Sequence, residues 1–172
     1  PRQARPEHHR RRAGRRANLP GRQVTPADIL SRLRRFLLIF SVLIFGGAVV
    51  ELWLVNHKED TLQLIPFALC ALGTAAALVA LFRPRRATVW LLRGTMALVA
   101  CGTLLGIYLH LDGNIDFQRE IDPNAPASDM LLSVLGGANP LLAPGILSVA
   151  AVLALAATYY HPALHGAETE GD

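Results

Sequence analysis

Four apolar stretches, each close to the length that an α-helix needs to cross a bilayer, constrain this chain more than any other feature. They cover residues 36–55, 62–82, 87–111 and 141–160, and about 20 apolar residues suffice for one crossing. Because lipid tails offer no partner to an exposed backbone N–H or C=O, such stretches must be helical in the membrane. The sequence therefore predicts an all-α membrane protein, with a four-transmembrane-helix bundle over residues 36–162.

The basic residues gather on one side of these predicted spans. Arginine dominates residues 2–35 and the loop at 83–86, whereas the loops on the other side hold only Lys58 and Arg119. Loops that carry the excess of Lys and Arg stay in the cytoplasm. We therefore expect a multi-pass protein of the bacterial inner (cytoplasmic) membrane, with both termini cytoplasmic and a short acidic tail at residues 163–172.

The segment before the first span divides into two parts. Residues 1–24 are an Arg-rich arm without apolar periodicity, which predicts disorder for the isolated segment. Thr25, Pro26 and Asp28 are typical of a helix start, so residues 25–35 are expected to form a short interfacial helix or, alternatively, to run straight into the first span. The arginines expected to contact anionic lipid or a partner are Arg10, Arg11, Arg12, Arg15, Arg16, Arg34 and Arg35. Nucleic-acid binding is disfavoured, because no aromatic residues interleave this arginine run.

Small residues indicate where the spans approach one another. Gly102 and Gly106 are four residues apart in the third span, and Ala150 and Ala154 have the same spacing in the fourth. Such pairs let helix backbones pack closely where lipid provides no hydrophobic drive.

Glu51 is the one acidic residue inside an apolar stretch, about one turn from the outer end of the first span. A carboxylate at this depth is costly unless it is paired, so it is a candidate for either pairing or proton transfer. His57, His110 and Arg119 are its candidate partners on the same outer side. Structural pairing, or snorkelling of the carboxylate to the nearby interface, is the favoured interpretation, and a proton site is the alternative.

The predicted outer loop, residues 112–140, carries a second polar group. Asp112, Asn114 and Asp116 have the spacing of the first three ligands of a calcium loop. However, Phe117 and Pro123 occupy the positions of the turn glycine and the final glutamate, which argues against such a loop. A looser metal site formed by His110, Asp112, Asn114 and Asp116 is the alternative to a solvated acidic loop.

The same loop contains a short apolar segment. Ser128 can cap a helix over residues 129–135 that ends at Gly136. This helix is too short to cross the membrane and too apolar for water. We expect it to lie on the outer membrane face or against a partner, with Leu131 and Leu135 in contact.

The last two spans and their loop resemble uncharacterised four-span bacterial inner-membrane proteins. The resemblance rests on GIYLH at 106–110, Gly113, Asn114, Phe117, Glu120, GANP at 137–140, LAPG at 142–145 and YHP at 160–162. It implies no activity.

The function expected from the sequence is that of a non-catalytic accessory subunit of a larger respiratory or photosynthetic inner-membrane assembly. Its partners would be other integral membrane subunits and anionic lipids. No cofactor is predicted, and a bound lipid or quinone stays open. The alternatives are a small proton-coupled transporter centred on Glu51, and a membrane enzyme or metal-binding protein that uses the outer His and Asp residues.

Overall fold

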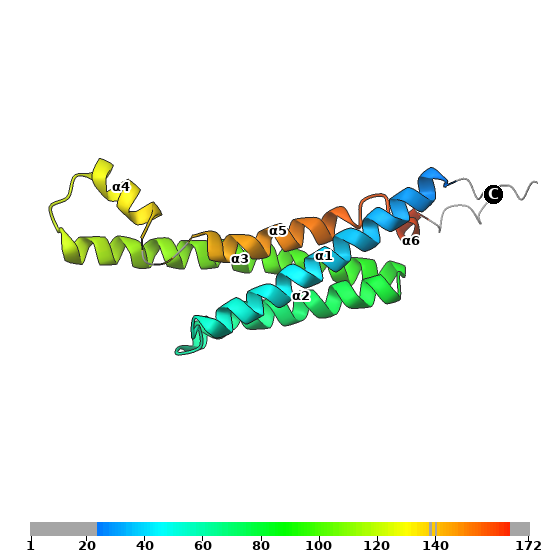
Figure 1. Cartoon of the computed structure of the whole chain (residues 1–172), viewed down its shortest axis with the longest axis horizontal. Coiled ribbons are helices and arrows are strands. Elements are labelled where there is room, and N and C mark those ends of the chain that lie inside the picture. The colour runs from blue at the N-terminus through cyan, green and yellow to red at the C-terminus, as the bar shows by residue number, and fades with distance from the viewer. Residues whose placement is uncertain (1–23, 138, 140, 166–172) are drawn as a thin grey trace, which may run out of the picture.

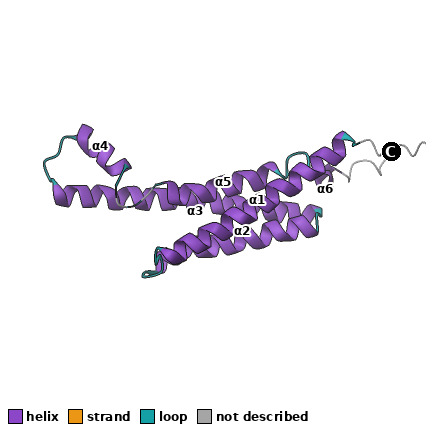
Figure 2. Cartoon of the chain, in the orientation of Figure 1, coloured by secondary structure: helices purple, strands orange, loops and turns teal. Residues whose placement is uncertain are grey.

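A computed structural model describes residues 24–137, 139 and 141–165, and within them every regular element is a helix (Figures 1 and 2). The arm at residues 1–23, with Arg10, Arg11, Arg12, Arg15 and Arg16, and the tail at residues 166–172 lie outside the described residues. The elements are α1 (Pro26–Leu54), the 3₁₀ turn η1 (Thr61–Leu64), α2 (Ile65–Phe82), α3 (Arg86–Ile121), α4 (Ala127–Leu135), α5 (Leu142–Ala156) and α6 (Pro162–His165).

Four of these helices, α1, α2, α3 and α5, pack side by side. α1 contacts α2 and α5, and α3 contacts the same two helices from the opposite side (Figure 1). The helices α1, η1–α2 and α3 are long and apolar enough to cross a membrane, which indicates a multi-pass membrane protein. The fourth predicted span, residues 141–160, is too long: its helix α5 is apolar but has only 15 residues and ends at Ala156. We call the end at residues 83–86 the basic end, and the end at residues 55–61 the outer end.

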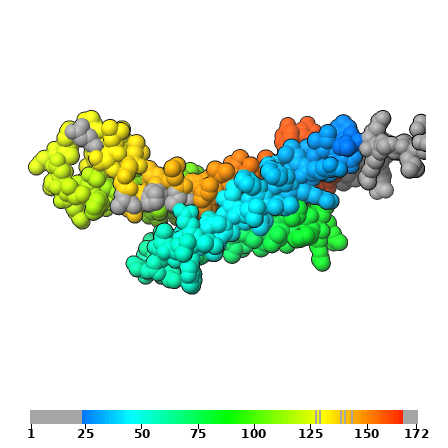
Figure 3. Space-filling view, viewed as in Figure 1, coloured from blue at the N-terminus to red at the C-terminus, as the bar shows by residue number. Residues whose placement is uncertain are grey.

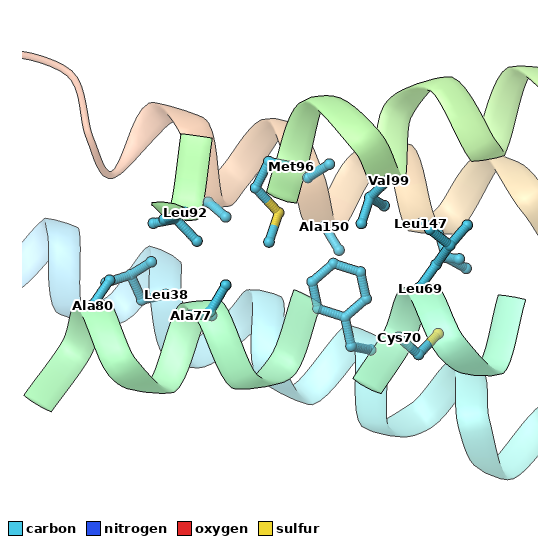
Figure 4. Packing of buried hydrophobic residues seen from close by; sticks show 14 of the residues in the cluster. Leu38, Leu69, Cys70, Ala77, Ala80, Leu92, Met96, Val99, Leu147 and Ala150 are labelled. Atoms are coloured by element: carbon cyan, nitrogen blue, oxygen red, sulfur yellow. The ribbon is translucent and has the colours of Figure 1, made fainter. Parts of the chain in front are cut away.

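Small residues bring the four helices close together. A Cβ atom at Gly73 of α2 would lie 2.7 Å from the ring of Phe45, which is fully buried on α1. A Cβ at Gly102 would collide with Leu69, and one at Gly106 would lie 3.2 Å from Pro144. The buried alanines of the core are Ala48, Ala76, Ala77, Ala80, Ala150, Ala151, Ala154 and Ala157 (Figure 4). Glycine and alanine therefore let the helix backbones approach closely around the few large buried side chains, such as Phe45 and Met96.

The first helix begins as its sequence indicates but is longer than expected. Thr25 Oγ1 accepts a hydrogen bond from the Asp28 N–H at 3.2 Å, and the Asp28 carboxylate accepts one from the Thr25 N–H at 3.0 Å. The favoured prediction of a separate interfacial helix at residues 25–35 is wrong, because α1 continues without a break to Leu54. No proline follows Pro26 within this segment to remove a backbone donor and interrupt the helix.

The third helix is also longer than its predicted span. α3 has 36 residues, so it is about 54 Å long, against about 30 Å for the hydrocarbon core. The predicted loop 112–140 is therefore wrong over its first ten residues, which are helical. α4 folds back along this projecting part of α3 (Figures 1 and 3), and we call residues 112–137 the outer arm. α4 begins at Ala127 after Pro126, not behind a Ser128 cap, and ends before Gly136 as expected.

Candidate functional sites at the two ends of the bundle

At the basic end, two arginines from different helices bind the end of the fourth bundle helix. Arg34 of α1 donates from Nη2 to the carbonyls of Tyr159 and Tyr160, at 3.2 and 2.7 Å. Arg93 of α3 donates from Nε to Thr158 Oγ1 at 3.0 Å and from Nη2 to the Thr158 carbonyl at 3.1 Å. These carbonyls belong to the turn that directly follows α5, beyond its last residue Ala156. The partial negative charge at a helix C-terminus makes cations favourable there. Arg34, expected to contact lipid or a partner, thus binds its own chain.

His161 follows these carbonyls directly. Its partial burial lowers the pKa of the imidazole, and the positive charges of Arg34 and Arg93 lower that pKa further. His161 Nδ1 also accepts a hydrogen bond from the Ala163 N–H at 3.2 Å. Both observations favour the neutral ring, with its proton on Nε2.

An open pocket of about 440 Å³ lies beside this capped helix end. It is lined by Arg86, Trp90, Arg93, Tyr159, Tyr160, Leu164 and His165. Tyr160 stacks on His165 with ring centroids 5.4 Å apart, and the Arg93 guanidinium lies 5.1 Å from the Trp90 ring centroid. The pocket exists because α5 ends at the level of Arg93, which is about 10 Å along α3 from Arg86.

The basic end has an excess of positive charge. Its described arginines are Arg32, Arg34, Arg35, Arg83, Arg85, Arg86 and Arg93. In the part of the chain that the structure describes, the one ion pair joins Arg119 to Asp116 at 3.8 Å, on the outer arm. None of the arginines at the basic end is therefore neutralised by a carboxylate of the described chain, and the pocket there favours anions.

At the other end of the molecule, Asn114 fastens the outer arm. Its side chain is fully buried, and its Nδ2 donates to the carbonyls of Val134 and Asn139, each at 2.9 Å. Its Oδ1 accepts from the Asn139 N–H at 2.9 Å. A Cβ atom at Gly137 would lie 2.6 Å from the Asn114 side chain, so glycine is needed there for the close approach. Asn114, expected as a metal ligand or loop residue, is instead a clamp between α3 and the segment that returns to the bundle.

Of the residues expected near Glu51, the structure brings His57 and His110 close to each other. The rings of His57 and His110 lie 6.4 Å apart between centroids. Partial burial lowers the pKa of His57, and the neighbouring His110 lowers it further. The Glu51 side chain is exposed on α1 and has no hydrogen bond or ion pair within the described residues. The predicted pairing of Glu51 with either histidine is therefore not found.

The metal hypothesis for the outer segment is not supported by this arrangement. Asp112 and Asp116 are exposed on a continuous helix, and Asn114 is engaged by backbone groups. Asp112 and Asp116 are four residues apart and share one face of α3, but Asn114, two residues from each, points in another direction. The three side chains therefore do not converge on one ion as they would in a loop. Among the described residues, no three His, Cys, Asp or Glu side chains are grouped so that they could hold a metal.

The outer arm presents apolar side chains. Leu131, Leu132 and Leu135 of α4 are 59%, 76% and 51% exposed, whereas Val134 is buried against the rest of the arm. Phe117 and Ile121, on the projecting part of α3, are exposed as well. Exposed apolar groups of this kind outside the bundle are typical of a surface that binds protein or membrane.

Comparisons with protein-family models, with characterised proteins and with solved structures found no match to this chain.

Proposed function

We propose that this protein is a non-catalytic accessory subunit of a larger bacterial inner-membrane complex, respiratory or photosynthetic, and that its outer arm binds a neighbouring integral membrane subunit. The observation that supports the proposal is the exposed apolar face of α4, formed by Leu131, Leu132 and Leu135. A helix of nine residues cannot cross the bilayer. Burying its three leucines against a partner is favourable because it removes apolar surface from water. Burial of apolar surface is worth about 25 cal/mol for each Å².

The Asn114 clamp supports binding by the arm. Its three hydrogen bonds hold the segment after α4 against α3, so the leucines are presented in a fixed position before any partner arrives. A surface that is already ordered loses less conformational entropy on binding. A clamped apolar helix is therefore better suited to binding a partner than a free loop of the same composition.

The proposed topology has four crossings, with both termini in the cytoplasm. α5 packs along α1 and α3 and runs from the level of Gly106 to that of Arg93. A span of 15 residues is shorter than the hydrocarbon core. Local thinning of the bilayer would let this short helix cross. Arg34 and Arg93 would then lie at its inner end, where their charges can reach the headgroups.

Cysteine labelling tests this topology. In a variant with Cys70→Ala and Cys101→Ala, we expect a membrane-impermeant maleimide to label Asn124→Cys from outside, because Asn124 is exposed between α3 and α4. Arg85→Cys, at the basic end, should react only after the membrane is permeabilised. The opposite pattern would contradict the proposed orientation.

Co-purification tests the accessory role. Changing Leu131 and Leu135 together to Ser should reduce recovery of the partner subunits by about tenfold or more from mildly solubilised native membranes, since each exposed leucine contributes about 1 kcal/mol or more when buried. Ser133→Ala, an exposed position of the same helix, is the matched control and should leave recovery unchanged. Membrane insertion should be equal in both. If the unmodified protein purifies alone as a homogeneous species, the proposal is wrong.

The alternative functions gain no support from these positions. A proton-coupled transporter centred on Glu51 would need that carboxylate to face a polar path through the bundle, and it is exposed on the surface of α1. An enzyme or metal-binding protein that uses the outer His and Asp residues would need them to converge, and Asp112 and Asp116 remain on the surface of α3.

A further inference from the structure

We infer that the pocket at the basic end, lined by Arg86, Trp90, Arg93, Tyr159, Tyr160 and His165, binds the phosphate group of an anionic phospholipid of the cytoplasmic leaflet. This inference rests on the membrane insertion of the bundle and on the orientation proposed above. It does not depend on the partner proposed for the outer arm.

The first support is the depth of the pocket. Arg86 is the first residue of α3, and Arg93 lies two turns further on, so the pocket covers the first turns of a candidate span. The side chains of Trp90, Tyr159 and Tyr160 are more than half exposed around it. Trp and Tyr prefer the level of the lipid headgroups, where one part of the ring is apolar and the other meets water. The shortness of α5 opens space at that level.

The second support is the hydrogen-bonding capacity of the two arginines. Arg93 uses Nε and Nη2 for Thr158, and its Nη1 has no hydrogen-bond partner among the described residues. Arg86 is exposed, and the described chain offers it no carboxylate. Arginine N–H groups make short, charge-assisted hydrogen bonds to phosphate oxygens. The pocket is therefore lined by two cations that can attract a phosphate.

The third support is the mixed character of the walls. The rings of Trp90, Tyr159 and Tyr160 supply apolar surface beside the cations, and the pocket is open to its surroundings. An inorganic phosphate ion has no apolar surface that could pack against these rings, whereas the glycerol and first acyl carbons of a phospholipid can cover them. The combination of cationic and aromatic lining residues thus favours a lipid over a free anion.

Tryptophan fluorescence can test the inference, because the protein has two tryptophans, Trp53 at the outer end of the bundle and Trp90 at the basic end. In the full chain with Trp53→Phe, reconstituted in phosphatidylcholine vesicles, Trp90 alone reports on the pocket. We expect brominated phosphatidylglycerol to quench Trp90 with an association constant about fivefold or more above that of brominated phosphatidylcholine, the factor for one favourable Arg contact near the surface. In the Trp90→Phe variant, Trp53 at the outer end should show a smaller preference for the anionic lipid.

Two charge variants locate the binding. Arg86→Gln should remove most of the preference at Trp90, whereas Arg83→Gln, an exposed arginine of the same loop that does not line the pocket, should keep it. Equal effects of the two variants, or no preference for the anionic lipid in the parent, would overturn the inference. So would loss of the preference on addition of inorganic phosphate but not of chloride at equal ionic strength, because that result would assign the pocket to the free ion.

Discussion

Replacing Asn114 by alanine should loosen α4 and the segment after it from α3, at a cost of about 3 kcal/mol. The side chain is fully buried and makes three hydrogen bonds, to the Val134 carbonyl and to both backbone groups of Asn139. Alanine would leave those groups without their partner, and one buried polar group left unsatisfied costs about 1–3 kcal/mol. Part of this cost would be recovered as the arm opens and water reaches the freed groups.

Hydrogen exchange measures this release. In Asn114→Ala, the backbone amides of residues 130–139 should exchange about a hundredfold faster than in the parent, as a loss of about 3 kcal/mol in the opening free energy requires. The amides in the membrane-embedded part of α1 should be unchanged. Asp112→Ala, an exposed position on the same helix, is the control and should have little effect. Unchanged protection of residues 130–139 in Asn114→Ala would show that the clamp does not hold the arm.

Replacing Arg34 and Arg93 together should be more damaging than either change alone. We expect Arg34→Ala and Arg93→Ala to lower the free energy of unfolding by about 2 kcal/mol each, since hydrogen bonds to a charged group contribute about 1.5–3 kcal/mol. The two arginines bind the consecutive carbonyls of residues 158–160. After the first is lost, the second holds a loosened turn, so the effects should not add.

A double-mutant cycle in detergent or bicelles checks this expectation. The free energies of unfolding of the parent, both single variants and the double variant give the coupling, which should exceed about 0.5 kcal/mol for residues that share one structural unit. Arg35→Ala removes an exposed arginine next to Arg34 and should change the stability little. Additive effects would mean that each arginine stabilises the protein independently of the other.

The helical class and the candidate spans could be predicted from the sequence because they depend on local signals. Long apolar stretches define α1, α2 and α3. The capping box that starts α1 is formed by Thr25 and Asp28, which lie within four residues of sequence. The arginine cap could not be predicted in the same way. Arg34 and Tyr160 are 126 residues apart in the chain. No local pattern predicts that the turn after α5 lies within reach of the Arg34 guanidinium group.

The outer arm shows how a correct local signal can mislead. Asp112, Gly113 and Asn114 are typical turn residues, yet all three lie inside α3. The Asn114 side chain does not hydrogen-bond to the backbone of its own helix, because it is bound to backbone groups of Val134 and Asn139. Gly113 leaves room for the Asn139 side chain, which would lie 3.1 Å from an added Cβ. The tertiary contacts of these residues thus override their turn preference.

The length of α3 also separates charge along the molecule. Arg86 and Arg93 lie near its start, while Asp112, Asp116 and Glu120 follow at four-residue spacing near its far end. In the proposed orientation, the cations face the electrically negative cytoplasm and the carboxylates face the positive outside. Transferring one elementary charge against a potential of 100 mV costs about 2.3 kcal/mol. Inverting the molecule would move both sets of charges the wrong way, so an energised membrane would itself hold the protein in the proposed orientation.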